Sequence, residues 1–159
     1  MSKATSKTQW LVLGGLILLC LAVGGIGGGA TAGAIDGWYR TIAKPSWTPP
    51  DWVFGPVWTV LYIMMAVAAW RVWKAGERVK PALVLFFVQL ALNLAWTLIF
   101  FNAQSPGLAL AEILLLWLSV AATMMAFFGR DTVAGWLFVP YLAWVSFAGI
   151  LNAAIWMMN

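Results

Sequence analysis

Aromatic and polar side chains recur at helical spacing along three apolar stretches of the sequence. In one stretch, Trp58, Tyr62 and Met65 share a helical face. Two later stretches have comparable faces, made of Gln89, Asn93, Trp96 and Phe100, and of Tyr141, Trp144, Ala148 and Asn152. Uncharged polar groups are unfavourable against lipid, so these faces are predicted to point inward. They are typical of a small-molecule cavity with flat walls and few hydrogen-bond donors. The spacing fits equally well with polar residues that join helices to one another.

A segment rich in Trp and Pro precedes these faces, over residues 38–58. Its tryptophans are Trp38, Trp47, Trp52 and Trp58. Proline restricts its own backbone and that of the preceding residue, so the segment is predicted to be stiff. Each Trp adds a large apolar ring and one N–H donor. Such a segment would either anchor helices at a membrane surface or cover a pocket for a flat apolar ligand.

Other reactive groups are few. The chain has no His and one Cys, Cys20, so we expect no metal site and no histidine base. Glu112 is the one carboxylate well inside an apolar stretch, which makes it either a functional candidate or a residue near the membrane interface. Glycines over residues 24–33 lack the strand and helix of a dinucleotide-binding unit. Their four-residue spacing favours close helix packing, within the chain rather than between two copies.

Composition identifies the class of protein. Of 159 residues, 64% are hydrophobic and 9% are charged, and the mean hydropathy is +0.91. A soluble domain of this size carries far more charge. Continuous apolar runs, rather than alternating ones, predict helices that cross a membrane. We therefore expect an all-α membrane protein with a single domain over residues 1–159. Its five transmembrane helices are predicted at about 10–34, 52–73, 82–101, 108–128 and 133–158, with the Trp/Pro-rich loop at 35–51.

The basic residues predict the orientation. Seven of the nine Lys and Arg lie on the N-terminal side of the predicted spans, and only Arg40 and Lys44 lie on the other. The positive-inside rule then places the N-terminus in the cytoplasm and the Trp/Pro-rich loop outside. Basic residues at the ends of apolar runs set topology, so the pI of about 9.6 does not indicate nucleic-acid binding. A secretory signal ending near Ala30–Ala32 is a rival interpretation, but the run from Leu11 to Ala34 is long for one.

The same residues resemble those of a known family. The relevant runs are Trp38–Tyr39, Lys44–Pro50, Gly55–Trp58, Asn93 with Trp96, and Pro140–Tyr141 with Trp144. In this order they resemble the translocator protein family, also called tryptophan-rich sensory proteins or peripheral-type benzodiazepine receptors. The likeness extends over nearly the whole chain and points to a bacterial member, in the bacterial cell membrane or the outer membrane.

The resemblance implies five transmembrane helices, usually a homodimer, and a pocket closed by the loop between the first two helices. Family ligands are porphyrins such as protoporphyrin IX, isoquinoline and benzodiazepine drugs, and cholesterol in animals. No basic residue follows Tyr141, so the sterol pattern of animal members is incomplete here. The ligand-binding residues expected in this chain are Trp38, Trp47, Trp58, Tyr62, Asn93, Trp96, Tyr141, Trp144 and Ala148.

Three functions follow as hypotheses. The first is a sensor or carrier that binds tetrapyrroles and regulates their metabolism, with Arg40 and Lys44 meeting the propionates. The second is an enzyme that degrades protoporphyrin IX in light, because two family tryptophans linked to this activity match Trp58 and Trp144. The third is a transporter of sterol-like or other hydrophobic ligands. We expect no cofactor other than a porphyrin as ligand or substrate. The expected partners are that porphyrin, membrane lipid and a second copy of the chain, with no nucleic acid.

Overall fold

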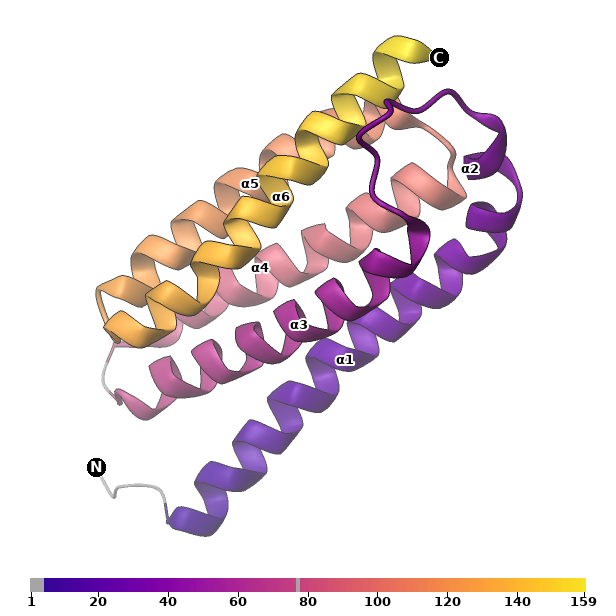
Figure 1. The fold of residues 1–159 in the computed structure, drawn as a ribbon. Coiled ribbons are helices and arrows are strands. Elements are labelled where there is room, and N and C mark those ends of the chain that lie inside the picture. The colour runs from indigo at the N-terminus through magenta and orange to yellow at the C-terminus, as the bar shows by residue number, and fades with distance from the viewer. Residues whose placement is uncertain (1–4, 77) are drawn as a thin grey trace.

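The computed structural model describes residues 5–76 and 78–159, most of which lie in long helices (Figure 1). The helices are α1 (Ser6–Asp36), the short α2 (Trp38–Thr41), α3 (Asp51–Lys74), α4 (Lys80–Thr97), the π-helical η1 (Leu98–Asn102), α5 (Pro106–Phe128) and α6 (Thr132–Met158). Five helical units are long and apolar enough to cross a membrane, with α4 and η1 counted together. The described residues contain no strand. The predicted all-α bundle of five membrane-spanning helices is confirmed.

Helix boundaries follow from capping and from proline. Asp131 is the N-cap of α6, where its Oδ1 accepts from the Ala134 amide at 2.8 Å. Aspartate is among the residues preferred at this position. Pro81 and Pro106 lie in the first turns of α4 and α5, where their missing N–H is not needed. The structure differs from the expected loop over 35–51, because α1 continues to Asp36 and α2 forms one turn after it.

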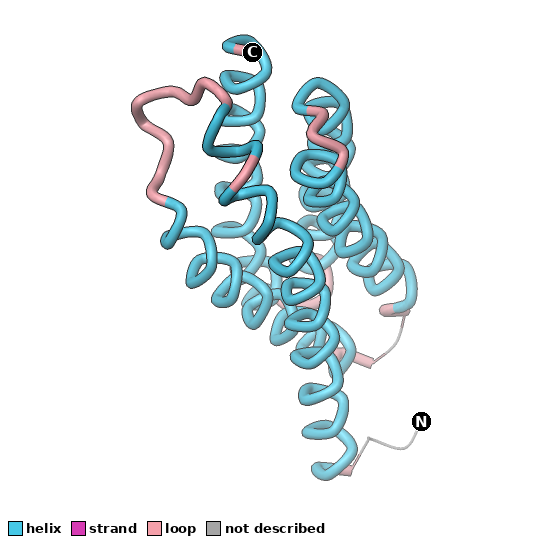
Figure 2. The backbone as a smooth tube through the Cα atoms, turned by 90° about the vertical axis from the view of Figure 1, so that its right-hand side faces the viewer, coloured by secondary structure: helices cyan, strands magenta, loops and turns pink. Residues whose placement is uncertain are grey.

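The helices do not pack equally. α6 lies between α3 and α5, and α4 packs on α5 from the other side (Figures 1 and 2). α1 lies at the edge of the bundle, against α3 and the part of the chain formed by α4 and η1. The start of α1 and the end of α6 lie at opposite ends of the bundle, as expected for an odd number of spans (Figures 1 and 2). α1 is therefore the helix that the bundle covers least.

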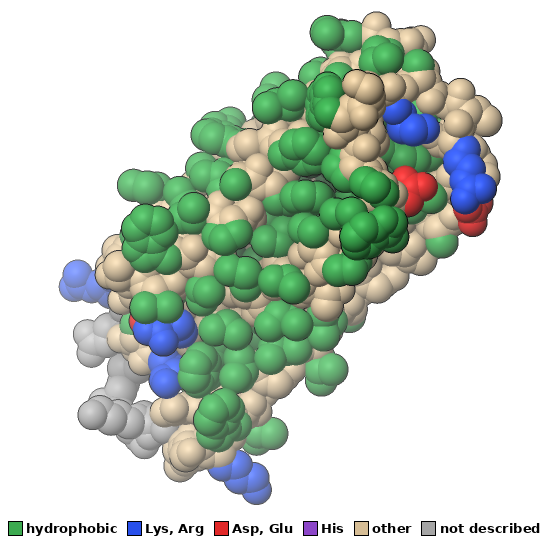
Figure 3. Space-filling view, in the orientation of Figure 1, with side chains coloured by type: hydrophobic (Ala, Val, Ile, Leu, Met, Phe, Trp, Pro, Cys, Tyr) green, Lys and Arg blue, Asp and Glu red, His purple; other side chains and the backbone are tan. Residues whose placement is uncertain are grey.

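The surface has an apolar middle and basic ends (Figure 3). Exposed Leu, Ile and Val side chains cover the middle, which suits contact with lipid tails, while most exposed Trp side chains lie near helix ends. The described basic residues at the end where α1 begins are Lys7, Arg71, Lys74, Arg78, Lys80 and Arg130. Arg40 and Lys44 lie at the other end, beside the connection from α1 to α3. The fold thus separates the charges into the two groups that the sequence predicted.

One ion pair joins α3 to the start of α6. The Arg71 guanidinium donates from Nε and from an Nη to the two carboxylate oxygens of Asp131, both at 2.9 Å. A bidentate pair of this kind has a defined geometry, which a single contact lacks. The guanidinium holds the pKa of Asp131 below its usual value, against the opposing effect of burial. Asp131 therefore links a helix cap to a contact between helices.

We predict that Asp131→Asn lowers the thermal unfolding temperature in detergent. Asn can still accept from the Ala134 amide as an N-cap, so the expected loss is that of the half-exposed ion pair with Arg71, up to about 1 kcal/mol. Because the folded-state pKa is depressed, this stability is present above pH ~4 and is lost as the pH falls through the folded-state pKa. Asp36→Asn, which removes an exposed i,i+4 pair with Arg40, is the matched control. Equal melting curves for wild type and Asp131→Asn at pH 7 would contradict the assignment.

Candidate functional site

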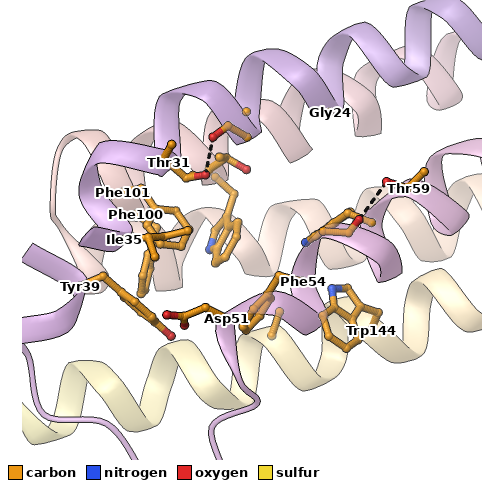
Figure 4. A pocket seen from close by; sticks show the side chains of 18 of the residues that line it. Gly24, Thr31, Ile35, Tyr39, Asp51, Phe54, Thr59, Phe100, Phe101 and Trp144 are labelled. Carbon is orange, nitrogen blue, oxygen red and sulfur yellow. Dashed lines mark hydrogen bonds between the residues drawn. The ribbon is translucent and has the colours of Figure 1, made fainter. Parts of the chain in front are cut away.

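The candidate site is a cavity of about 560 Å³ at the end of the bundle nearest α2. α1 forms one wall, the part of α3 from Asp51 to Tyr62 another, and α2, α4 with η1 and the last turns of α6 close the rest (Figure 4). This volume is within the range of small-molecule pockets. The lining is chiefly apolar and aromatic. The cavity therefore suits a flat, largely apolar ligand.

Four elements contribute the aromatic walls. α3 supplies Phe54 and Trp58, and α6 supplies Trp144, whose ring meets Phe54 edge-on at 5.9 Å between centroids. From the opposite side come Trp96 and Phe100, stacked at 5.3 Å. These rings support one another at distances typical of favourable aromatic pairs. Contacts between the rings therefore hold these walls in position.

The π-helical turn η1 shapes one of these walls. Its wider winding is marked by a hydrogen bond from the Ala103 amide to the Leu98 carbonyl, five residues back, at 3.0 Å. Both Phe100 and Phe101 of this turn line the cavity, with ring centroids 4.8 Å apart. Single π-helical turns occur often at functional sites. Here the turn brings two consecutive rings to the same cavity.

Small residues of α1 form the opposite wall. The bundle approaches α1 most closely at Gly24, where an added Cβ would lie 2.6 Å from Cε2 of the Tyr62 ring. Gly25 and Gly28 also line the cavity, but an added Cβ at either would meet no atom within 4 Å. The Gly-rich stretch therefore serves packing within the chain at one position and leaves open space at others. Both features depend on the absence of side chains.

The cavity opens sideways between α1 and α3. Exposed residues of its lining lie on both of these helices, namely Leu21, Gly25, Gly28 and Ala32 on α1, and Gly55 and Thr59 on α3. This opening lies on the side of the bundle, where lipid would surround the protein. A hydrophobic ligand dissolved in the membrane could enter there without crossing the loop.

A chain of buried hydrogen bonds lies beside the cavity, further into the bundle. Tyr62 Oη donates to Asn93 Oδ1 at 2.5 Å, and Asn93 Nδ2 donates to Tyr141 Oη at 3.1 Å. Tyr141 Oη in turn donates to Gln89 Oε1 at 2.8 Å. This chain joins α3, α4 and α6. The predicted inward faces therefore have two roles. Their deeper residues join helices to one another, and their residues nearer the loop line the cavity.

Nearer the loop, Asn152 joins α6 to both α4 and α5. Its Oδ1 accepts from the Trp96 indole N–H at 3.0 Å, and its Nδ2 donates to the Pro106 carbonyl at 2.7 Å. The indole N–H groups of Trp58 and Trp144 differ, because they have no acceptor within the described part of the chain. Together with the Tyr39 hydroxyl, which also has no partner among the described residues, these two donors are available to a ligand.

The loop after α2 is tied to α6. The Asn159 side chain accepts from the Ala43 amide at 2.9 Å and donates to the Ala43 carbonyl at 3.0 Å. Trp47 packs its edge on Phe147 at 5.9 Å, while the Lys44 ammonium donates to the carbonyls of Tyr39 and Ile42. The loop is therefore fixed against α6, but none of its residues 42–50 lines the cavity.

The charged groups near the loop are arranged unevenly. Arg40 is paired with Asp36 at 2.8 Å, and neither residue lines the cavity. Asp51 does line it, and lies beside Tyr39 (Figure 4). The pKa of Tyr39 is raised to about 12, chiefly by burial and further by the negative charge of Asp51. Within the described residues, Asp51 has neither an ion pair nor a hydrogen bond.

The predicted ligand-binding residues fall into three groups. Trp58, Tyr62, Trp96, Trp144 and Ala148 line the cavity. Asn93 and Tyr141 lie in the hydrogen-bond chain beside it, and only Tyr62 belongs to both groups. The tryptophans of the connecting segment, Trp38 and Trp47, support it from outside, with Trp38 packed edge-on against Phe100 at 5.8 Å. Thus five of the nine predicted residues face the cavity directly.

Other lining residues were missed by the sequence reasoning. They include Thr31 and Ile35 near the end of α1, Tyr39 of α2, Asp51 and Phe54 at the start of α3, and Phe101 of η1. Most lie in the predicted loop over 35–51 or in the first predicted span, where the glycines were the only residues with a recognisable pattern. Asp51 carried a usable signal, since it is a lone acid within the Trp/Pro-rich segment.

Glu112 lies apart from the cavity. Its side chain is buried within the bundle, in the second turn of α5, and neither carboxylate oxygen has a hydrogen-bond partner among the described residues. No group of three or more His, Cys, Asp or Glu within the described residues is placed to hold a metal ion. The chemistry of the site therefore rests on rings, two free indole donors, the Tyr39 hydroxyl and one carboxylate.

We predict that Gly24→Ala lowers both the unfolding temperature and the affinity for cavity ligands. The new methyl group would displace the buried Tyr62 ring and disturb its bond to Asn93, a change of about 1–3 kcal/mol. Gly25→Ala is the matched control, because its methyl group would enter open space. Thermal unfolding in detergent measures the difference. If both variants unfold at the same temperature, the close approach at Gly24 does not contribute to stability.

Known proteins resemble this chain over most of its length. The TspO/MBR family model matches residues 16–157. The "Tryptophan-rich protein TspO" of Chlorobaculum tepidum is 48% identical over 155 residues, which cover 95% of this chain and 98% of that protein. The "Tryptophan-rich sensory protein" of Cereibacter sphaeroides is 47% identical, covering 84% and 85% of the two chains. The human "Translocator protein" is 44% identical, covering 77% and 75%. With five membrane-spanning helices, an aromatic cavity beside the first connection and these relatives, the chain belongs to the TspO/MBR family.

Proposed function

We propose that this protein is a membrane sensor or carrier that binds tetrapyrroles such as protoporphyrin IX and has a regulatory role in their metabolism. The observation that carries the proposal is the cavity with ring-lined walls on four elements. A porphyrin is a flat apolar ring system that would stack on Trp and Phe faces. The relatives named for sensing and translocation support the sensor or carrier part of the proposal.

The free donors define how such a ligand would be held. Trp58 and Trp144 offer indole N–H groups that the described protein leaves without acceptors. The ring walls would supply most of the binding energy, and these donors would fix orientation. A ligand that is soluble in the membrane would enter through the opening between α1 and α3. This route does not require the loop tied to α6 to move.

We predict that protoporphyrin IX quenches tryptophan fluorescence of the detergent-purified protein saturably in the dark. Trp144→Ala should weaken this binding about tenfold, the equivalent of a lost stacking contact of about 1.4 kcal/mol. Trp136→Ala, which removes an exposed ring outside the cavity, is the matched control. Non-saturable quenching in wild type, or equal weakening in both variants, would refute binding in this cavity.

A second candidate function is light-dependent degradation of the bound porphyrin. It is favoured by the presence of both Trp58 and Trp144 on the cavity wall, where excited porphyrin would meet oxidisable indoles. Illuminating the same titrated samples separates the two functions. Loss of the porphyrin absorbance that is slower in Trp144→Phe supports the enzyme, whereas a stable spectrum supports the sensor or carrier.

We also propose a homodimer, inserted with the N-terminus on the cytoplasmic side. α1 has the smallest buried share of the five spanning helices, at 11%, so the bundle leaves surface for a second copy. Light scattering corrected for detergent should give twice the chain mass of 17.4 kDa. A single chain mass across the accessible concentration range would contradict the dimer.

A further inference from the structure

One charged side chain contributes to the cavity lining, and it is an acid. Among the described lining residues, Asp51 alone carries a charge. It is the first residue of α3, directly after the proline-rich end of the loop. It faces Tyr39 across the end of the cavity away from Trp144 (Figure 4). A ligand that fills the cavity would therefore place one edge near a negative charge.

Nothing in the described protein neutralises this carboxylate. The ion pairs join Arg40 to Asp36 and Arg71 to Asp131, so neither includes Asp51. Lys44 is the nearest basic residue along the loop, but its ammonium donates to two backbone carbonyls and lies 4.5 Å from the Tyr39 ring centroid. Lys44 does not line the cavity. The cations expected to receive carboxylates of a ligand are thus engaged elsewhere.

We propose that Asp51 makes this end of the cavity selective for ligands with a neutral, hydrogen-bond-donating or cationic edge, and against ligands with a carboxylate there. The inference rests on the proposed function, because it concerns the same cavity and flat aromatic ligands. A tetrapyrrole would bind with its carboxylates directed away from Asp51, or in a form whose carboxylates are esterified. The ring walls set which shapes enter, and Asp51 sets which charge is tolerated.

The physical basis is an unpaired charge at short range. Asp51 is exposed and lies in the first turn of α3, so solvent and the helix dipole both weaken its interaction with a charge on the ligand. We therefore expect a selectivity of about threefold to tenfold. The effect should shrink as salt is added, because charges at the mouth are screened.

The test compares protoporphyrin IX with its dimethyl ester, which has the same ring but no carboxylates. The ratio of the two affinities is measured in wild type, Asp51→Asn and Asp51→Glu by fluorescence titration in the dark. Taking the ratio within each protein, and then comparing proteins, cancels the different partitioning of the two compounds into detergent. Asp36→Asn removes the same charge from the same end of the molecule, outside the cavity, and serves as the matched control.

We expect the preference for the ester to fall about threefold to tenfold in Asp51→Asn, and to stay near the wild-type value in Asp51→Glu and Asp36→Asn. An unchanged ratio in Asp51→Asn overturns the proposal. So does an equal change in Asp36→Asn, which would show a general effect of surface charge.

Acridine orange, a flat cationic dye, separates failure of this inference from failure of the proposed function. Its binding should weaken about threefold or more in Asp51→Asn. If neither porphyrin compound binds wild type but the dye binds and responds to Asp51→Asn, the tetrapyrrole function fails and the charge selectivity stands. If none of the three compounds binds saturably, both proposals fail.

Discussion

The buried hydrogen-bond chain between α3, α4 and α6 is the constraint on which the cavity depends. Burying a polar group in a bundle is costly unless the group is paired. Tyr62, Asn93, Tyr141 and Gln89 pair with one another in sequence, from one helix to the next. This fixes both the rotation and the height of three helices relative to one another. The aromatic residues one or two turns nearer the loop are thereby held in positions that surround a space.

Because the polar groups deeper in the bundle are hydrogen-bonded to one another, they are not available to bind a ligand. Trp96 is likewise paired, through Asn152, and contributes its ring face rather than its donor. The indole donors of Trp58 and Trp144 remain available. The site thus combines rigid polar contacts beside it with apolar rings around it. That combination favours recognition by shape, since hydrogen bonds to the ligand are few.

Much of this could be predicted from the sequence. Long apolar runs predict the five spans as helices, because a helix pairs the backbone N–H and C=O groups that lipid cannot satisfy. Gln89 and Asn93 had to face inward for the same reason, and both are buried. Spacing could not separate Asn93 and Tyr141, which join helices, from Trp58 and Trp144, which line the cavity. All four lie on inward faces, and only the tilt and height of neighbouring helices decide which of them reaches the open space.

The residues of α1 show a further limit of sequence patterns. Gly24 and Gly25 are adjacent and look alike in the sequence, but a side chain at the first would collide with Tyr62 and one at the second would meet open space. The π-helical turn could not be foreseen either, because the extra residue that places Phe101 at the cavity has no distinctive composition. Packing against the rest of the bundle determines both outcomes.

Ring walls of this kind distinguish flat ligands from bulky ones, but they discriminate poorly among flat ligands. Every aromatic ligand presents a π-face, so stacking alone gives little chemical selectivity. A charge at the cavity end changes this, because it acts on the edge of the ligand rather than on its face. Asp51 is held at the first residue of α3, between the stiff loop and the first ring of the wall, Phe54. The bundle therefore selects the shape of the ligand, and the connection between α1 and α3 selects its charge. Because different parts of the chain determine the two properties, either can change without rebuilding the other.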